Sequence, residues 1–148
     1  MKLNYVVGFA FNKEKTHVLL IKKTKPVWQN GLLNGIGGKI ENYDITPYHA
    51  MTREFLEECN IKTTEEEWYY FCKLDSEAFE LNCFVGFFDD ELLNSFETIT
   101  EEQVQLIDIQ DLFSNRFNGC ISNLQWLISI CLDQDLYKIF IVGKYNHC

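Results

Sequence analysis

Residues 37–61 read GGKIENYDITPYHAMTREFLEECNI, and the two halves of this stretch differ in character. The first half begins with adjacent glycines, which let other groups approach the backbone closely. The second half predicts a helix, because Thr46 is a good N-cap, Pro47 suits the first helical position and Asn60 tolerates the left-handed conformation that ends many helices. The buried face of this helix is predicted to comprise Ala50, Met51, Phe55 and Cys59, which recur at helical spacing.

Three glutamates share one face of the predicted helix. Glu54, Glu57 and Glu58 stand at i, i+3 and i+4, which are neighbouring positions on a helix surface. Carboxylates this close repel one another unless a cation lies among them, and oxygen-rich clusters suit Mg²⁺ or Mn²⁺. Arg53 can reach Glu57, four residues on, in a bidentate contact. Alone, such a triplet also fits a solvated acidic surface, but a preceding glycine-rich strand end favours a metal site.

The stretch resembles the Nudix signature, G-x5-E-x7-R-E-U-x-E-E-x-G-U, in which U is apolar. The matching residues are Gly38 for the opening glycine, Arg53, Glu54, Glu57 and Glu58 for the R-E-x-x-E-E core, and Phe55 and Ile61 for the apolar places. Asp44 stands where the signature has Glu, the separation from Arg53 is one residue longer, and Asn60 replaces the last glycine. We expect the shorter side chain and the extra residue to offset each other, so that Asp44 still contacts Arg53.

The resemblance implies an α+β fold of layered α/β/α type, with a mixed sheet flanked by helices. It also implies hydrolysis of a nucleoside diphosphate linked to another group X, with Mg²⁺ as cofactor and Mn²⁺ as a substitute. The ion neutralises the pyrophosphate, so that water can attack phosphorus in line. The implied metal ligands are Glu54 and Glu58, with Glu57 sharing an ion or its water molecules and the Gly37 carbonyl as a backbone ligand.

Other catalytic roles also follow from the resemblance. Arg53 would orient Glu57, and Lys39 would steady a phosphate unless it is a solvated strand lysine. The general base differs between members of the family. Glu102, with Glu101 beside it, resembles in placement the loop acid that some members use, although a solvated loop acid has the same appearance.

Substrate-binding candidates lie outside the signature. Asn34 resembles the base-reading asparagine of oxidised-purine nucleoside triphosphatases, and Asn123 resembles a second such residue in MutT-like enzymes; a turn residue and a helix cap are their alternative roles. Trp28 could stack on a base, although core packing is the usual role of an aromatic residue, and Lys23 belongs to an early cluster of bases. We therefore expect a MutT-like triphosphate pyrophosphohydrolase that acts on oxidised purine nucleotides. Hydrolysis of ADP-ribose, NAD-derived or dinucleoside polyphosphate substrates is the first alternative, and a catalytically silent nucleotide sensor is the second.

The remaining sequence predicts alternating strands and two further helices. Strands are expected at 5–11 and 17–23 as one hairpin, at 67–74 and 78–88 as another, and at 104–109 and 136–143. A short helix is expected at 110–115 and a longer one at 122–134. No linker or repeat divides the chain, so residues 1–148 are expected to form one domain.

Composition limits the partners and the location of the protein. The net charge of −9 argues against a general nucleic-acid binder, which usually has a basic face. No apolar run is long enough to span a membrane, and no secretory signal is recognisable, so we expect a cytoplasmic protein without a membrane partner. The six cysteines lack C-x-x-C spacing and are expected to be reduced core thiols, with Cys148 in an exposed tail. A homodimer is compatible with the sequence.

Overall fold

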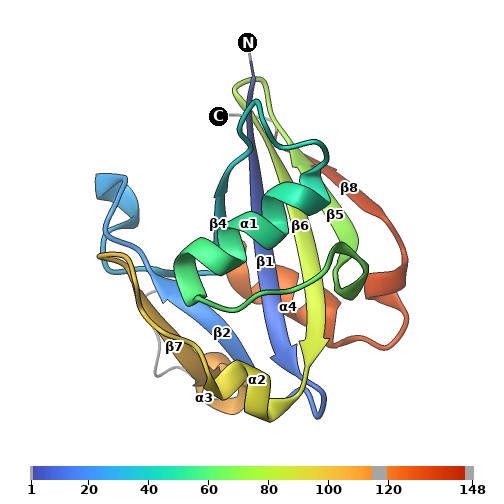
Figure 1. Cartoon of the computed structure of the whole chain (residues 1–148). Helices are drawn as coiled ribbons and strands as arrows, with labels where there is room; N and C mark the ends of the chain where they lie inside the picture. Colours follow the sequence, from blue (N-terminus) through green and yellow to red (C-terminus); the bar gives the residue numbers. More distant parts are fainter. Residues whose placement is uncertain (1, 115–119, 146–148) are drawn as a thin grey trace.

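Strand β1 (Leu3–Asn12) forms the centre of the sheet in this computed structural model, which describes residues 2–114 and 120–145 (Figure 1). Its side chains alternate between two buried faces, as the two-residue period of a strand requires. Val7, Phe9 and Phe11 point into one apolar cluster, whereas Val6 and Ala10 point into the other. The sheet therefore has a core on each side.

Strand β1 divides its pairing between several neighbours. Its carboxyl-terminal part pairs antiparallel with β2 (His17–Lys22), and its amino-terminal part pairs antiparallel with β4 (Ile36–Lys39). On its other side β1 pairs in parallel with β6 (Phe79–Phe88) along its whole length. Strand β3 (Leu33–Asn34) pairs with β2, whereas β4 pairs with β1. At Gly35, between β3 and β4, the chain therefore changes its pairing partner from β2 to β1. This crossing places the predicted glycines beside the middle of the sheet.

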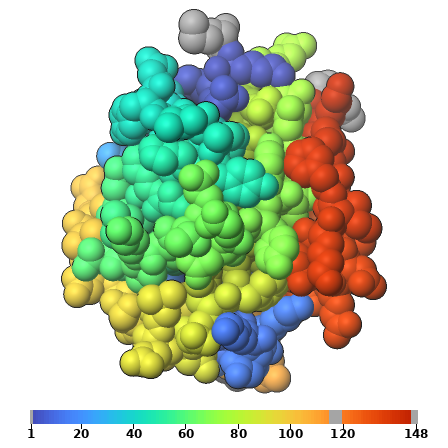
Figure 2. All heavy atoms as spheres, turned by 45° about the vertical axis from the view of Figure 1, so that its right-hand side comes forward, coloured from blue at the N-terminus to red at the C-terminus, as the bar shows by residue number. Residues whose placement is uncertain are grey.

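The sheet has the order β3-β2-β1-β6-β5-β8, with β4 paired to β1 and β7 paired to β2 outside this path. Its other strands are β5 (Tyr69–Asp75), β7 (Gln103–Asp108) and β8 (Ile141–Lys144). The α-helices are α1 (Pro47–Cys59), α2 (Asp90–Asn94), α3 (Ile109–Phe113) and α4 (Leu124–Leu132), and single 3-10 turns occur at Val27–Gln29, Glu65–Glu67 and Leu136–Lys138. The segment that contains β8 forms one edge of the molecule and is red in Figure 2.

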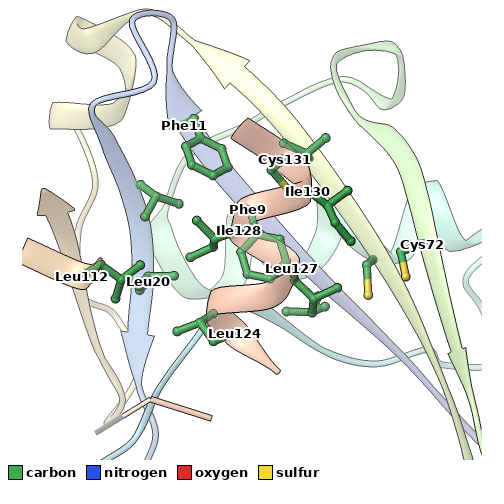
Figure 3. Close-up of a cluster of buried hydrophobic side chains, with 14 of the residues drawn as sticks. Phe9, Phe11, Leu20, Cys72, Leu112, Leu124, Leu127, Ile128, Ile130 and Cys131 are labelled. Atoms are coloured by element: carbon green, nitrogen blue, oxygen red, sulfur yellow. The ribbon is translucent and has the colours of Figure 1, made fainter. Parts of the chain in front are cut away.

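Helices α1 and α4 cover opposite faces of the sheet (Figure 1). Helix α1 buries Met51 and Phe55, whereas α4 buries Leu124, Leu127 and Ile128 against the other face (Figure 3). The predicted layered α/β/α fold with a mixed sheet is thus confirmed, as are the two predicted hairpins.

The last predicted strand is shorter than expected. Residues 136–143 were expected to be extended, but Leu136–Lys138 form a 3-10 turn and β8 begins only at Ile141. The Asp133 carboxylate accepts hydrogen bonds from the backbone N–H groups of Asp135 (2.9 Å) and Leu136 (3.1 Å). These contacts favour a turn over a strand, because they satisfy backbone donors locally.

The cysteines of the described residues are unpaired thiols, as predicted. They are Cys59, Cys72, Cys83 and Cys131, which are buried, and Cys120, which is partly buried. Cys148 lies outside the described residues. No helix in residues 2–114 and 120–145 has the length and apolar character needed to cross a bilayer.

Candidate active site

The segment between β4 and α1 brings the predicted glycines against the helix. Helix α1 begins as expected, because Thr46 Oγ1 accepts a hydrogen bond from the His49 N–H (3.1 Å), and Asn60 ends it in the left-handed conformation with φ 58°. Gly38 lies against Glu54, and a Cβ at position 38 would come within 2.5 Å of Glu54 Oε1. The glycine therefore leaves the space that the Glu54 carboxylate occupies.

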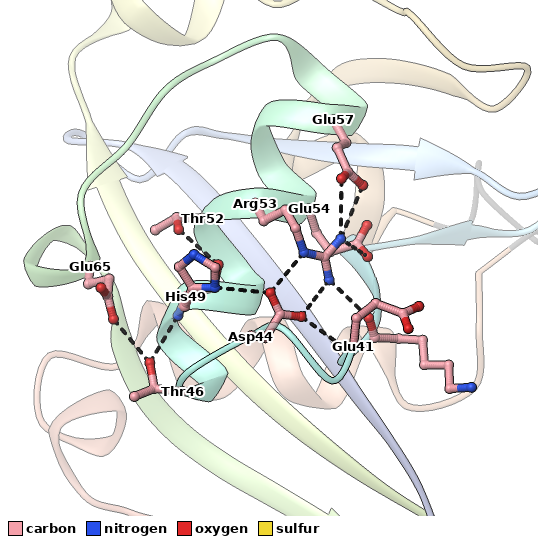
Figure 4. A network of polar contacts seen from close by, with 10 residues as sticks. Glu41, Asp44, Thr46, His49, Thr52, Arg53, Glu54, Glu57 and Glu65 are labelled. Carbon is pink, nitrogen blue, oxygen red and sulfur yellow. Dashed lines mark hydrogen bonds and ion pairs between the residues drawn. The ribbon is translucent and has the colours of Figure 1, made fainter.

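Asp44 and Arg53 are in direct contact, as expected despite the shorter acid and the extra residue (Figure 4). Arg53 Nε donates to Asp44 Oδ1 (2.9 Å), and Nη2 donates to Oδ2 (2.7 Å). The Glu41 N–H (2.8 Å) and His49 Nδ1 (3.0 Å) also contact this carboxylate, which is 0% exposed. The hydrogen bonds from Arg53 lower the pKa of Asp44 to about 2, against the opposing effect of burial.

Arg53 distributes its remaining donors over the site. Nη1 contacts Glu54 Oε1 (3.1 Å) and Glu57 Oε2 (3.2 Å), so the predicted contact between Arg53 and Glu57 is confirmed. Nη2 also donates to the backbone carbonyl of Lys39 (3.1 Å), which ties the helix to the end of β4. The ring of Tyr43 lies over the guanidinium at 5.4 Å from its centroid, within the range of a cation–π contact. Arg53 thus connects the strand, the loop and the acidic face.

The three signature glutamates differ in environment. Glu54 is only 8% exposed, and burial raises its pKa to about 7, although Arg53 acts in the opposite direction. The Glu57 side chain is 53% exposed. Glu58 accepts a hydrogen bond from Thr100 Oγ1 (3.1 Å), and burial raises its pKa as well. Glu54 and Glu58 therefore carry a desolvation cost that a nearby cation would offset.

A divalent ion fits this face if it keeps part of its water shell. Within the described ranges, no three His, Cys, Asp or Glu side chains converge as a preformed metal cage. Mg²⁺ needs no such cage, because it usually retains several water molecules and binds through one or two carboxylates. Glu54 and Glu58 stand one turn apart on α1, and the backbone of Gly37 is next to the glycine that Glu54 contacts. These groups are the candidate ligands.

Glu102 lies beside this face but is closely held. It is 5% exposed, and its carboxylate accepts hydrogen bonds from the Thr24 N–H (2.6 Å) and Lys23 Nζ (3.0 Å). Burial raises its pKa, but these contacts outweigh it and the net shift is downward. The Thr100 hydroxyl, which donates to the Glu58 carboxylate, accepts a hydrogen bond from the Glu102 N–H (3.2 Å). The structure therefore brings Lys23 and Glu102 close to Glu58, whereas the neighbouring Glu101 is exposed and pairs with Lys25.

Three further candidate residues, Lys39, Asn34 and Trp28, lie outside the acidic face of α1. Lys39 ends β4 with an exposed side chain. Asn34 ends β3, and its Oδ1 accepts a hydrogen bond from the Gly35 N–H (2.8 Å). Trp28 is 68% exposed in the loop that follows Lys23, so it is not a core residue.

Asn123 lies apart from the acidic face, at the start of α4 on the opposite side of the sheet. It occupies the N-cap position, but its side chain makes no capping hydrogen bond. Its Nδ2 instead donates to Tyr145 Oη (3.0 Å), beside a cavity of about 220 Å³ that Trp126 also lines. The structure does not bring Asn123 into contact with Asn34 or with the glutamates among the described residues.

Three residues near the site were missed in the sequence. His49 contacts Asp44, Tyr43 covers Arg53, and Thr100 links its own loop to Glu58 on the helix. One signal for His49 was available, because it precedes Arg53 by four residues and therefore lies on the same helix face. The role of Thr100 depends on a contact 42 positions away along the chain, which no local pattern predicts.

Comparison with known proteins supports the same assignment. A family model described as the NUDIX domain matches residues 2–124. The chain belongs to the NUDIX family. As a member of this family, the protein is a Nudix pyrophosphohydrolase, an enzyme that acts on acid anhydrides. Nudix hydrolases are also found among the solved structures that share its fold. The family generally uses a divalent metal ion.

Solved structures share the Nudix fold at low sequence identity. A MutT structure, from a study of the Aliivibrio salmonicida and Vibrio cholerae proteins, has a TM-score of 0.68 at 23% identity and aligns with 87% of this chain and 98% of its own. A bifunctional NMN adenylyltransferase/ADP ribose pyrophosphatase from Francisella tularensis, complexed with AMP and Mn, has a TM-score of 0.71 at 19% identity; the match covers 89% of this chain and 41% of that protein. The NUDIX domain of Shewanella oneidensis NrtR, complexed with ADP ribose, gives 0.71 at 15% identity, with 87% and 85% covered. No curated protein matches the sequence.

Proposed function

We propose that the protein is a MutT-like pyrophosphohydrolase that converts a purine (deoxy)nucleoside triphosphate and water into a nucleoside monophosphate and pyrophosphate, with oxidised purines among its substrates. The observation that carries the hydrolytic part is the assembly of Gly38, Asp44 and Arg53 around Glu54. In this assembly the buried Glu54 carboxylate lies against the end of β4, one helical turn from the exposed Glu57. That arrangement suits the binding of a cation and an anionic substrate.

Each residue of this assembly has a proposed task. Mg²⁺, or Mn²⁺ in its place, would neutralise the polyphosphate and polarise phosphorus when bound. Glu54 and Glu58 would hold the ion with the Gly37 carbonyl, and Glu57 would bind a second ion or a coordinated water molecule. Arg53 would orient the Glu57 side chain, because its Nη1 donates a hydrogen bond to Glu57 Oε2.

The chain also offers groups for the phosphates and for proton transfer. Lys39, exposed at the end of β4, would contact a phosphate oxygen, and Lys23 would add positive charge beside Glu58. The water oxygen attacks phosphorus, the bond to the pyrophosphate oxygen breaks, and a carboxylate takes the proton. Glu102 remains a proposed base, although its hydrogen bonds favour a role in holding Lys23 and Thr24 next to the site.

The position of Asn34 supports a purine substrate. Its Oδ1 accepts a hydrogen bond from the Gly35 N–H, and its Nδ2 donates to none of the described residues. The amide can therefore donate to an acceptor on the base edge, such as the O6 atom of guanine, more readily than it can accept from the amino group of adenine. We accordingly expect guanine nucleotides to be preferred over adenine nucleotides, with exposed Trp28 available for stacking.

The substrate assignment is tested with a panel of nucleotides in the presence of Mg²⁺. The panel comprises dGTP, 8-oxo-dGTP, dATP, ADP-ribose, NADH and Ap4A, with products resolved by chromatography. Pyrophosphate and a nucleoside monophosphate from the guanine triphosphates support the proposal. AMP and ribose phosphate from ADP-ribose would support the alternative substrate class. Among the similar structures, one is a bifunctional ADP ribose pyrophosphatase and another is complexed with ADP ribose. Nucleotide binding without turnover would identify a sensor rather than an enzyme.

Matched variants test whether the acidic face is responsible. Glu57→Gln should abolish most activity without unfolding the protein, because the side chain is 53% exposed. Glu66→Gln, on an exposed 3-10 turn, removes the same charge outside the acidic face of α1 and should leave activity unchanged. Asn34→Ala should reduce the preference for guanine over adenine by about 2- to 10-fold, which corresponds to the loss of one hydrogen bond. An unchanged preference would refute the proposed role of Asn34.

A further inference from the structure

His49 is fixed by two hydrogen bonds at the start of α1. Its backbone N–H donates to the N-cap residue Thr46 (3.1 Å), and its ring Nδ1 lies 3.0 Å from Asp44 Oδ1. The ring is 39% exposed, whereas the Asp44 side chain is fully buried. His49 therefore forms part of the cover over the Asp44 carboxylate.

The surroundings of Asp44 define which nitrogen of His49 carries a proton. Asp44 is ionised at neutral pH and can only accept hydrogen bonds. Nδ1 must therefore be the protonated nitrogen in this contact. With Arg53 Nε and Nη2 and the Glu41 N–H, the carboxylate then has four donors, two for each oxygen. This matches the acceptor capacity of a carboxylate.

We propose that His49 is a positioning residue of the metal site, and this inference rests on the proposed function. His49 and Arg53 are four residues apart and share one helix face, so both contact Asp44 Oδ1 (Figure 4). His49 holds Asp44, Asp44 holds Arg53, and Arg53 directs Nη1 to Glu54 and Glu57. The Nudix signature specifies no residue at position 49, which lies between its acid and its arginine.

The need for His49 follows from two of the three departures of this chain from the signature. Asp44 is one methylene shorter than the Glu of the signature, and its loop to Arg53 is one residue longer. A short acid on a longer loop requires more contacts to remain in one position. The ring supplies one such contact, and the N–H of Glu41 supplies another.

Two substitutions separate the hydrogen bond from the packing of the ring. His49→Asn keeps an N–H donor at the same number of bonds from Cα as Nδ1, whereas His49→Leu keeps bulk and removes the donor. Outer contacts of this kind typically change metal affinity or activity by about 10- to 100-fold. We expect the Leu variant to bind Mn²⁺ about 10-fold more weakly and to have a kcat lower by about 10-fold, with an unchanged KM for nucleotide. The Asn variant should recover most of both losses.

Mn²⁺ binding is measured by electron paramagnetic resonance without nucleotide, on proteins whose folding is checked by thermal unfolding. Equal Mn²⁺ affinity in wild type and a folded Leu variant would overturn the proposal, as would equal losses in the Leu and Asn variants. Because this measurement needs no turnover, it tests His49 even if no nucleotide of the panel is hydrolysed, an outcome that would refute only the proposed function.

A second measurement applies even if the Leu variant does not fold. Long-range ¹H–¹⁵N NMR spectra of the wild-type protein distinguish the protonation states of the histidine rings, of which the chain has three. The signal of His49 is assigned by its disappearance in His49→Asn. A protonated Nδ1 at neutral pH supports the contact with Asp44, and an unprotonated Nδ1 would refute it.

Discussion

Asp44→Asn tests the brace that holds Arg53. The pKa of Asp44 is about 2 in the folded protein, against an ordinary value of 3.8. Because the pKa is lower in the folded than in the unfolded protein, the ionised carboxylate stabilises the fold, by about 2–3 kcal/mol at neutral pH. The amide cannot carry the charge and turns a donor toward Arg53, so we expect a loss of about 2–4 kcal/mol in the free energy of unfolding.

The pH dependence of this loss distinguishes the charge effect from a packing effect. A group whose pKa is lowered by folding contributes stability that is complete above its unfolded pKa and disappears as the pH falls through its folded pKa. The gap between wild type and Asp44→Asn should therefore be constant from pH 7 to about pH 5, fall to roughly half near pH 3, and largely vanish below pH 2.

Urea unfolding of both proteins at pH 7, 5 and 3 measures this gap, provided that the wild type remains folded at the lowest pH. Asp90→Asn changes an exposed residue in the first turn of α2; it is the matched control and should change stability by less than about 1 kcal/mol at each pH. A gap that is the same at pH 7 and pH 3 would show that the loss arises from packing. No gap at pH 7 would refute the brace itself.

Four further substitutions test other parts of the site. Gly38→Ala should lower kcat by about 100-fold at small cost in stability, because its Cβ would displace the flexible Glu54 carboxylate by roughly 1 Å. Gly37→Ala should instead unfold the protein, since its Cβ would lie 2.0 Å from a backbone carbonyl of β1. Thermal unfolding and steady-state kinetics test both variants, and greater loss of stability in Gly38→Ala than in Gly37→Ala would contradict this reasoning. Trp28→Ala should leave the melting temperature unchanged and raise KM for nucleotide by about 5- to 100-fold if the exposed ring stacks on the base; an unchanged KM would remove Trp28 from the binding site. Glu102→Gln should lower the free energy of unfolding by about 1–3 kcal/mol with less than a 100-fold loss of kcat, because its hydrogen bonds hold a loop. A larger loss of kcat at unchanged stability would instead support Glu102 as the general base.

Helix α1 was predictable because the sequence signals that define it are local. Thr46, Pro47 and Asn60 mark its ends, and its buried face repeats at helical spacing. The contact of Arg53 with Glu57 follows from their separation by one turn. The contact between Asp44 and Arg53 was predicted from the balance of side-chain and loop lengths, and it is present.

The rest of the site depends on contacts between distant segments. The pairing of β1 with both β4 and β6 places the glycines beside α1, but strand order in a mixed sheet leaves little trace in sequence. The burial of Glu54, and with it the rise of its pKa, results from this packing rather than from its neighbours in the chain. The same holds for Glu102, whose placement beside Glu58 requires β7 to pair with β2. Glu54 and Glu102 were therefore predictable as candidate residues, but the burial and hydrogen bonds that make their environments differ were not.

The central claim is that the acidic face of α1 binds the metal ion that drives triphosphate hydrolysis. The most direct test is the rate of pyrophosphate release from dGTP as a function of Mg²⁺ concentration, for wild type, Glu58→Gln and the surface control Glu66→Gln. We predict no release without a divalent ion, saturable activation of wild type and control, and a rate at least about 100-fold lower in Glu58→Gln at every Mg²⁺ concentration. Equal rates and equal Mg²⁺ dependence in Glu58→Gln and wild type would contradict the account.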